Sequence, residues 1–249
     1  MIYGVAAAVV VVLTVGIAAL RRVSLPRRVS LEGIEDDEVV EAYDRLNRWP
    51  QFRLLRSIVI RELRRHHPEG VLVDIGCGPG YLLARIATAF PHLSLVGVDI
   101  AREMLSRAAG NMARRALESR ATFREGDIER LPLDECSVDF VVSTLSLHHW
   151  AQPEQALAEI ERVLKPGAQF IIFDVRRDSP RLLYLIIRFA QRWILPAALR
   201  RIDEPTGSFR AAYTPRELQA MISTTPFEEW RVQPGLFWTF VWGRKGAPT

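Results

Sequence analysis

Short apolar segments alternate with amphipathic segments along most of the chain. The apolar segments predict buried strands at residues 71–75, 93–99, 121–127, 138–143 and 169–175. The amphipathic segments predict helices that begin near Tyr81, Arg102 and Pro153. Strands that are apolar along their whole length and alternate with helices indicate a parallel sheet covered on both faces, which is the α/β class.

The C-terminal part adds an antiparallel element. Thr214, Pro215 and Glu217 supply the cap, the first-turn proline and the capping-box acid of a helix start. The segment after this helix has Pro234 and Gly235 between two aromatic-rich runs, in the sequence EEWRVQPGLFWTFVWGRK. This pattern predicts a terminal β-hairpin.

The N-terminal segment differs from the rest of the chain. Met1 to Leu20 carries no charge, and a helix of that length spans about 30 Å, the thickness of a bilayer's hydrocarbon core. Arginines follow the apolar run instead of preceding it, which favours an uncleaved anchor with the following chain in the cytoplasm. We expect a transmembrane anchor at residues 1–20, a juxtamembrane linker at 21–38 and the main domain at 39–249, in a single-pass membrane protein. A core helix or a cleaved leader is the alternative.

Composition narrows the classes of protein that fit. With 49% hydrophobic and 25% charged residues, the chain of 249 residues can bury a substantial core. The formal net charge is +4, but the arginines are spread among acids and only Lys165 and Lys245 are lysines. No basic stripe indicates nucleic-acid binding. Cys77 and Cys136 are too few for a disulfide framework, which indicates a reducing compartment.

The first predicted strand runs into a glycine-rich turn. Gly76, Gly78 and Gly80 occupy alternate positions in the sequence VLVDIGCGPGYL. In a doubly wound sheet, ligands bind beyond the carboxyl ends of the central strands, and glycine lets a ligand approach the backbone there. The dinucleotide fingerprint is G-x-G-x-x-G, whereas this turn has G-x-G-x-G, so it fits a pyrophosphate cradle less well. A simple strand-to-helix turn is the other interpretation.

Three acids lie at or near the ends of predicted strands. Asp99 closes the second strand, 19 residues after Gly80, where a carboxylate can accept both hydroxyls of a ribose. Asp127 follows the third strand and can accept from the exocyclic amine of adenine. Asp74 precedes the glycines and can bind a positively charged amino group. A nucleoside that also carries an amino group has a hydrogen-bond donor for each of these three acids.

These motifs resemble those of the class I S-adenosylmethionine-dependent methyltransferases, particularly the small-molecule and quinone-biosynthesis branch, methyltransferase type 11. The resemblance covers residues 39–245 and rests on DIGCGPG, GVDI, GDIERLPL, DFVVSTLSLHHW and VLKPGAQF. It implies a Rossmann-like, doubly wound sheet of seven mostly parallel strands with a C-terminal antiparallel hairpin. Together with an N-terminal transmembrane helix, this is the fold class that we expect.

The resemblance also implies that S-adenosylmethionine is the cofactor and lies across the ends of the first three strands. Asp74 and the glycines would hold its methionine part, Asp99 its ribose, and Asp127 with Ile128 its adenine. Tyr43 resembles the family's lid tyrosine, although a core or surface tyrosine is an equal alternative. The residues that we expect in the cofactor site are Asp74, Gly76, Cys77, Gly78, Gly80, Asp99, Ile100, Asp127, Ile128, Ser143 and Tyr43.

Two histidines follow the fourth predicted strand, in the sequence STLSLHHW. Methyl transfer from a sulfonium mainly requires that the partners are oriented and, for some acceptors, that a proton is removed. His148 is our candidate for the base or the orienting group, ahead of His149, because histidine can accept a proton near neutral pH. Both can instead cap and pack the next helix. No acid or cysteine at a useful spacing suggests a metal.

An insertion separates the fifth strand from the helix start at Thr214. Residues 179–202 contain no acid and predict an amphipathic helix. Arg181, Arg188 and Arg192 share one side of it, and the opposite side carries Leu183, Ile186, Ala190, Trp193 and Ile194. This pattern fits a helix in the headgroup region of an anionic membrane, and equally a substrate lid with solvated arginines.

We therefore expect a methyltransferase that uses S-adenosylmethionine and acts on a small, lipophilic acceptor at the cytoplasmic face of a membrane. Its partners would be that molecule and the membrane, and not nucleic acid. Two alternatives stay open. One is an NAD(P)-dependent oxidoreductase of the same fold, and the other is a membrane-associated protein that binds S-adenosylmethionine without catalysis.

Overall fold

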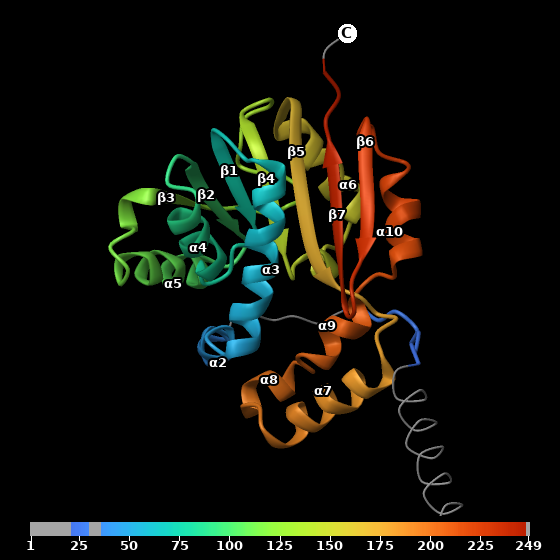
Figure 1. Ribbon diagram of the computed structural model, residues 1–249. Helices are drawn as coiled ribbons and strands as arrows, with labels where there is room; N and C mark the ends of the chain where they lie inside the picture. The colour runs from blue at the N-terminus through green and yellow to red at the C-terminus, as the bar shows by residue number, and fades with distance from the viewer. Residues whose placement is uncertain (1–20, 30–35, 248–249) are drawn as a thin grey trace, which may run out of the picture.

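The computed structural model describes residues 21–29 and 36–247, which form a seven-stranded sheet with helices on both faces (Figure 1). The strand order is β3-β2-β1-β4-β5-β7-β6. The strands are β1 (Val71–Ile75), β2 (Ser94–Asp99), β3 (Ala121–Glu125), β4 (Val138–Thr144), β5 (Leu164–Val175), β6 (Glu229–Pro234) and β7 (Trp238–Arg244).

The strand directions confirm the predicted Rossmann-like arrangement. Neighbours among β1 to β5 pair in parallel, and β7 pairs antiparallel with both β5 and β6. The terminal hairpin is therefore also confirmed. β1 lies between β2 and β4, so the chain changes direction across the sheet at β1. A switch point of this kind opens a crevice at the carboxyl ends of the strands.

Helices cover both faces of this sheet. On one face lie α3 (Pro50–His66), α4 (Tyr81–Ala89) and α5 (Arg102–Ala113), and on the other lie α6 (Pro153–Val163) and α10 (Pro215–Ile222). Leu72 of β1 packs in the first layer and Val73 in the second, and both are fully buried. This explains why every residue of β1 except Asp74 is apolar, since both faces of the strand are covered.

The start of α10 agrees with the signals in the sequence, whereas the insertion at residues 179–202 differs from its prediction. Thr214 caps α10 with the predicted capping box, and Pro215 is its first residue. The insertion at residues 179–202, predicted as one helix capped by Ser179, is two helices instead: α7 (Arg181–Trp193) and α8 (Ala197–Arg201). Pro196 lies between them, where its ring and missing N–H are incompatible with a continuous helix. The Ser179 hydroxyl donates to the carbonyl of Arg176, and Pro180 is the N-cap.

The insertion and the first helix lie together below the carboxyl ends of the strands (Figure 1). Here α2 (Asp37–Asn47) packs against α8, and α9 (Thr206–Ala211) leads from α8 toward α10. Leu46 of α2 and Leu199 of α8 are buried in this contact. The insertion therefore covers the end of the sheet at which ligands of this fold bind.

The predicted transmembrane anchor at residues 1–20 lies outside the described residues. Within residues 21–29 and 36–247, no helix has the length and apolar composition required to cross a bilayer. The longest helix there is α3, which has 17 residues and carries several arginines, whereas about 20 mostly apolar residues are needed. This finding goes against the expected membrane-spanning helix and against the single-pass localisation with a cytoplasmic domain.

Candidate cofactor and acceptor site

The glycine turn after β1 forms the floor of the site. The N–H groups of Gly76 and Cys77 donate to the carbonyl of Val98 at 2.8 and 3.1 Å, which ties the turn to the end of β2. Gly76 has a φ of +67°, and a Cβ there would lie 2.4 Å from the Ser146 hydroxyl oxygen. Gly78 has a φ of +50°, and its Cα faces open space. Glycine is required at Gly76 by packing and at Gly78 by conformation, which leaves bare backbone facing the crevice.

Asp99 connects this turn to the next helix. Its Oδ2 accepts from the N–H of Gly78 at 2.7 Å, and its Oδ1 accepts from the N–H of Ala101, the N-cap of α5, at 3.0 Å. One carboxylate thus holds two loops in fixed positions. Its place at the end of β2 follows the sequence prediction.

Asp74 lies beneath the glycine turn in an unusual environment. It is 1% exposed, and neither carboxylate oxygen has a hydrogen-bond partner among residues 21–29 and 36–247. Burial, together with the charge of Asp99, raises the pKa of Asp74 well above its ordinary value. A buried carboxylate of this kind is stabilised by a cation, so the site is suited to a ligand that carries an ammonium group.

A cavity of about 280 Å³ lies above the ends of β1, β2 and β3. It is lined by most of the predicted cofactor residues: Tyr43, Gly76, Gly78, Asp99, Ile100, Asp127 and Ile128. Asp127 also accepts from the N–H of Glu129 at 3.0 Å, which orders the loop after β3. The bare turn, the strand-end carboxylates and the unpaired Asp74 together fit S-adenosylmethionine, with its amino acid, ribose and adenine parts.

Four of the predicted cofactor residues do not line this cavity: Asp74, which is buried beneath the turn, Cys77, Gly80 and Ser143. Ser143 is fully buried, and its hydroxyl donates to the carbonyl of Ile75 at 2.8 Å, so it joins β4 to β1. Gly80 is the N-cap of α4, and a Cβ there would lie 2.9 Å from the Cβ of Ala108. Cys77 lines a neighbouring pocket, and burial raises the pKa of its thiol.

The neighbouring pocket, of about 90 Å³, is lined mainly by apolar side chains, with Asn47, Arg56 and Thr144 among the polar ones, and it adjoins the cofactor cavity. Both are lined by Tyr43, Gly76, Gly78 and Leu145. Its remaining walls come mainly from α3, α4 and the ends of β4 and β5. The apolar side chains of these walls are Phe52, Leu55, Val59, Leu82 and Phe173. An apolar pocket beside the glycine turn is suited to a hydrophobic second ligand.

The two histidines have different environments. His148 is 1% exposed, and its Nδ1 lies 2.7 Å from Oδ1 of Asp174, near the end of β5. Its backbone N–H donates to Oδ2 of the same carboxylate at 2.9 Å, and its Nε2 has no partner. His149 lines the cofactor cavity, whereas His148 does not, and the ring centroids lie 3.8 Å apart. His148 is thus held by an acid, and His149 is the one at the cavity.

Several residues of the site were not predicted from the sequence. Asp174 is an acid at the end of an apolar strand, the same signal that identified Asp99, but it lies 26 residues from His148 along the chain. Asp44 is 2% exposed and accepts from the Tyr81 hydroxyl at 3.0 Å, which ties α2 to α4. The cavity is also lined by Met104, Glu129, Ser146, Trp150 and Ala151.

Comparison with known proteins agrees with this geometry. A family described as "Methyltransferase domain" matches residues 73–172. The ubiquinone/menaquinone biosynthesis C-methyltransferase of Syntrophotalea carbinolica is 31% identical, with 70% of this chain and 78% of that protein covered. The demethylmenaquinone methyltransferase of Thermus thermophilus is 30% identical, with 74% and 82% covered. These relatives favour methyl transfer over the oxidoreductase alternative.

Solved structures agree on the fold. A SAM-dependent methyltransferase from Aquifex aeolicus has a TM-score of 0.59 at 20% identity, with 84% of this chain and 98% of that chain covered. The plantazolicin methyltransferase BpumL, in complex with a pentazolic desmethylPZN analog and SAH, has a TM-score of 0.64 at 18% identity, with 86% and 92% covered. The fold of this chain is therefore shared with these proteins.

Proposed function

The chain belongs to the class I S-adenosylmethionine-dependent methyltransferases, and from this premise we propose that it methylates a small, lipophilic acceptor that it meets at a membrane surface. The observation that carries the proposal is the apolar pocket lined by Phe52, Leu55 and Phe173, which adjoins the cofactor cavity. The relatives named for quinone biosynthesis act on molecules of this kind, as their names state.

The roles of the site residues follow from their positions. When bound, S-adenosylmethionine supplies a methyl group activated on a sulfonium. Asp74 pairs with an ammonium group, Asp99 accepts from hydroxyls, and Asp127 with Ile128 contacts the base. His148 is the proposed base because Asp174 orients its ring through Nδ1 and leaves Nε2 as an acceptor. His149, at the cavity, is the second candidate.

The nature of the acceptor is tested by where the methyl group goes. The protein is incubated with methyl-labelled S-adenosylmethionine and a demethylated naphthoquinone that carries a prenyl tail, with a water-soluble catechol in a parallel reaction. We expect labelled product in the organic phase of the first reaction. Methylation of the catechol alone would contradict a lipophilic acceptor.

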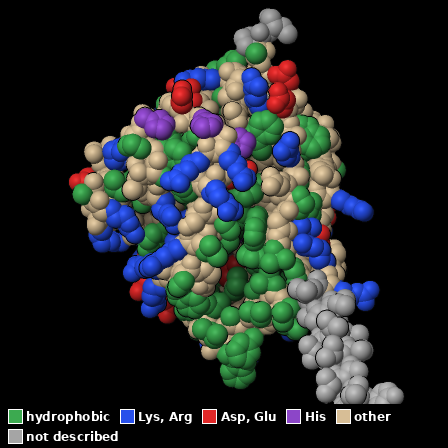
Figure 2. Space-filling view, viewed as in Figure 1, with side chains coloured by type: hydrophobic (Ala, Val, Ile, Leu, Met, Phe, Trp, Pro, Cys, Tyr) green, Lys and Arg blue, Asp and Glu red, His purple; other side chains and the backbone are tan. Residues whose placement is uncertain are grey.

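The outer face of α7 supports contact with a membrane surface. Leu182, Leu185, Ile186, Phe189 and Trp193 are 43–68% exposed, and they lie within about 100° of one another around the helix. Figure 2 shows hydrophobic side chains gathered there, low in the view. The arginines of α7 run along one edge of this stripe, and no acid occurs in residues 179–202. An apolar stripe edged by arginines complements an anionic lipid surface, whereas two copies packed face to face would bring arginines together.

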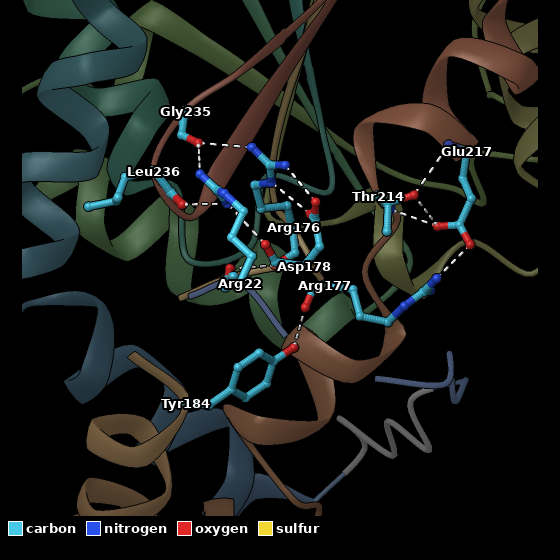
Figure 3. Close-up of polar contacts among 10 residues, drawn as sticks. Arg22, Arg176, Arg177, Asp178, Tyr184, Thr214, Glu217, Gly235 and Leu236 are labelled. Atoms are coloured by element: carbon cyan, nitrogen blue, oxygen red, sulfur yellow. Dashed lines mark hydrogen bonds and ion pairs between the residues drawn. The ribbon is translucent and has the colours of Figure 1, made fainter. Parts of the chain in front are cut away.

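Contacts at the start of α7 fix the direction in which this stripe points (Figure 3). Arg22 donates to the carbonyls of Asp178 and Leu236 at 2.9 and 3.1 Å. Arg176 pairs with Asp178 at 2.6 Å and donates to the carbonyl of Gly235 at 3.0 Å. The Tyr184 hydroxyl donates to the carbonyl of Arg177 at 2.6 Å, so the inner face of α7 is attached to the end of β5.

Quenching of Trp193 fluorescence by brominated lipid tests this contact locally. We expect vesicles of brominated phosphatidylglycerol to quench a fluorescence component that is absent from Trp193→Phe. Vesicles of brominated phosphatidylcholine should quench it less, because the arginines lose their anionic partners. Identical quenching of both proteins would show that α7 does not touch lipid, and concentration-dependent self-association would indicate a second copy on this face instead.

A further inference from the structure

A second cavity, of about 840 Å³, lies on the outer side of α3, α4 and α5. No Asp or Glu side chain lines it, whereas seven arginines do: Arg48, Arg53, Arg56, Arg64, Arg85, Arg114 and Arg115. Figure 2 shows Lys and Arg side chains gathered over this part of the molecule. Arg53, Arg56 and Arg64 lie in α3 and Arg85 lies in α4, while Arg48 follows α2 and Arg114 and Arg115 follow α5. These segments are distant in sequence, and only the fold brings their arginines together.

The positive charge of this cavity is largely unneutralised within the described residues. Arg48 pairs with the carboxylate of Asp44. Arg85 donates to neutral groups, the carbonyl of Arg53 at 3.1 Å and the Ser57 hydroxyl at 2.9 Å. Arg114 likewise donates to the side-chain oxygen of Asn111 at 2.6 Å. Neutral acceptors orient these guanidinium groups without balancing their charge.

One arginine of this cavity, Arg56, has a perturbed pKa. Burial, together with the charge of Arg85, lowers the pKa of Arg56 to about 10. The ring of Tyr81 lies 5.3 Å from the guanidinium carbons of both Arg56 and Arg115, a weak substitute for an anion. Arg56 and Tyr81 also line the apolar pocket, so the arginine cavity adjoins the proposed acceptor site.

We propose that this cavity binds a ligand carrying two or more phosphate charges. The planar guanidinium group binds phosphate oxygens through two parallel hydrogen bonds, and several such groups around one cavity favour a multiply charged anion over a single carboxylate. A free phosphorylated metabolite and a phospholipid headgroup share this chemistry. The inference does not depend on methyl transfer, since the arginine cavity is separate from the glycine turn and its acids.

The test uses two double variants of α3 in the full chain. Arg53→Gln with Arg64→Gln removes two arginines of the cavity, whereas Arg61→Gln with Arg65→Gln removes two exposed arginines of the same helix outside it. Both variants lose the same charge and keep a good helix former. Binding of inorganic pyrophosphate is measured by calorimetry at low salt, and flotation with vesicles of phosphatidic acid, whose phosphate monoester carries up to two charges, is measured in parallel.

We expect saturable pyrophosphate binding that weakens about tenfold or more in the cavity variant and less than about twofold in the control. Vesicle binding that shows the same contrast without pyrophosphate binding would support the cavity with a lipid headgroup as its ligand. The proposal would be overturned if the two variants lost equal affinity. It would also be overturned if neither pyrophosphate binding nor vesicle binding depended on the arginines of the cavity. Thermal unfolding of both variants confirms that each is folded when it is measured.

Discussion

Asp74 is a buried carboxylate whose two oxygens contact no hydrogen-bond donor. Its pKa is raised by burial and by Asp99. In the unfolded chain Asp74 is an ordinary acid with a pKa of about 4. Between these two pKa values the unfolded chain releases a proton that the folded chain retains. The stability of the ligand-free protein therefore falls as the pH rises through this window.

The variant Asp74→Asn should raise the stability of the ligand-free protein and lower its affinity for S-adenosylmethionine. Without ligand at neutral pH, we expect it to raise the free energy of unfolding by about 1–3 kcal/mol, because the buried ionisable group is gone. The difference should shrink as the pH falls through about 4, and it should be lost below that pH, where the acid is protonated in both states. Binding of S-adenosylmethionine should weaken, because its ammonium group loses an anionic partner. Denaturant unfolding at several pH values measures the stability, and calorimetry measures the affinity for S-adenosylmethionine. A variant that is less stable than the original protein and binds S-adenosylmethionine equally tightly would contradict both expectations.

His148 and His149 are adjacent in sequence but have different contacts: His148 contacts Asp174, and His149 lines the cofactor cavity. His148→Asn keeps an N–H that can donate to Asp174, so the buried carboxylate retains a partner and the fold is preserved. We expect it to lower kcat about 100-fold with little change in affinity for S-adenosylhomocysteine. His149→Ala, which alters the lining of the cofactor cavity, should mainly raise KM for S-adenosylmethionine. Full turnover by His148→Asn would remove His148 from the mechanism.

At the start of α10, one residue makes both a local capping contact and a tertiary ion pair. Glu217 completes the capping box with Thr214 and also pairs with Arg177, a 6%-exposed side chain on the neighbouring segment, at 2.5 Å. Thr214→Ala should cost about 1 kcal/mol, since it removes one cap. Glu217→Ala should cost more, because a buried arginine also loses its partner. Denaturant unfolding measures both, and equal losses would mean that the Arg177 pair adds nothing.

Sequence patterns predicted elements better than they predicted contacts between elements. The strands, the capping box of α10 and the hairpin follow from local spacing, which the fold preserves. The break at Pro196 was missed because the charge pattern across residues 179–202 is continuous. That pattern also placed Leu183 on the apolar face without showing that it packs inward beside Tyr184 while Trp193 faces solvent. Which side of an apolar helix is covered depends on its neighbours.

The same limit applies to the sites. The residues at the ends of β1, β2 and β3 could be predicted because parallel strands end at one edge of the sheet. Asp174 and the arginine cavity could not, because their members are distant in sequence and carry no shared motif. Juxtapositions of this kind arise only from the packing of several elements.

For the molecule as a whole, the insertion and the cofactor site are mechanically connected through α2. Leu199 of α8 is fully buried against Val39 and Leu46 of α2. Arg201 pairs with Glu38 at 2.5 Å beside this contact. Tyr43, on the same helix, lines both the cofactor cavity and the apolar pocket. Loosening α8 should therefore loosen one wall of the site.

The variant Leu199→Ala measures this connection against a matched control. It should cost about 2–5 kcal/mol of local stability, and Ile222→Ala, a buried position on α10 away from the site, should cost a similar amount. If α2 must be docked for binding, the apparent Kd for S-adenosylhomocysteine rises as the docked fraction falls, and we expect about a tenfold increase for Leu199→Ala alone. Calorimetry gives Kd, and hydrogen exchange shows whether α2 opens. Equal Kd values in the two variants would mean that α2 is positioned by Asp44 and Tyr81 instead, independently of the insertion.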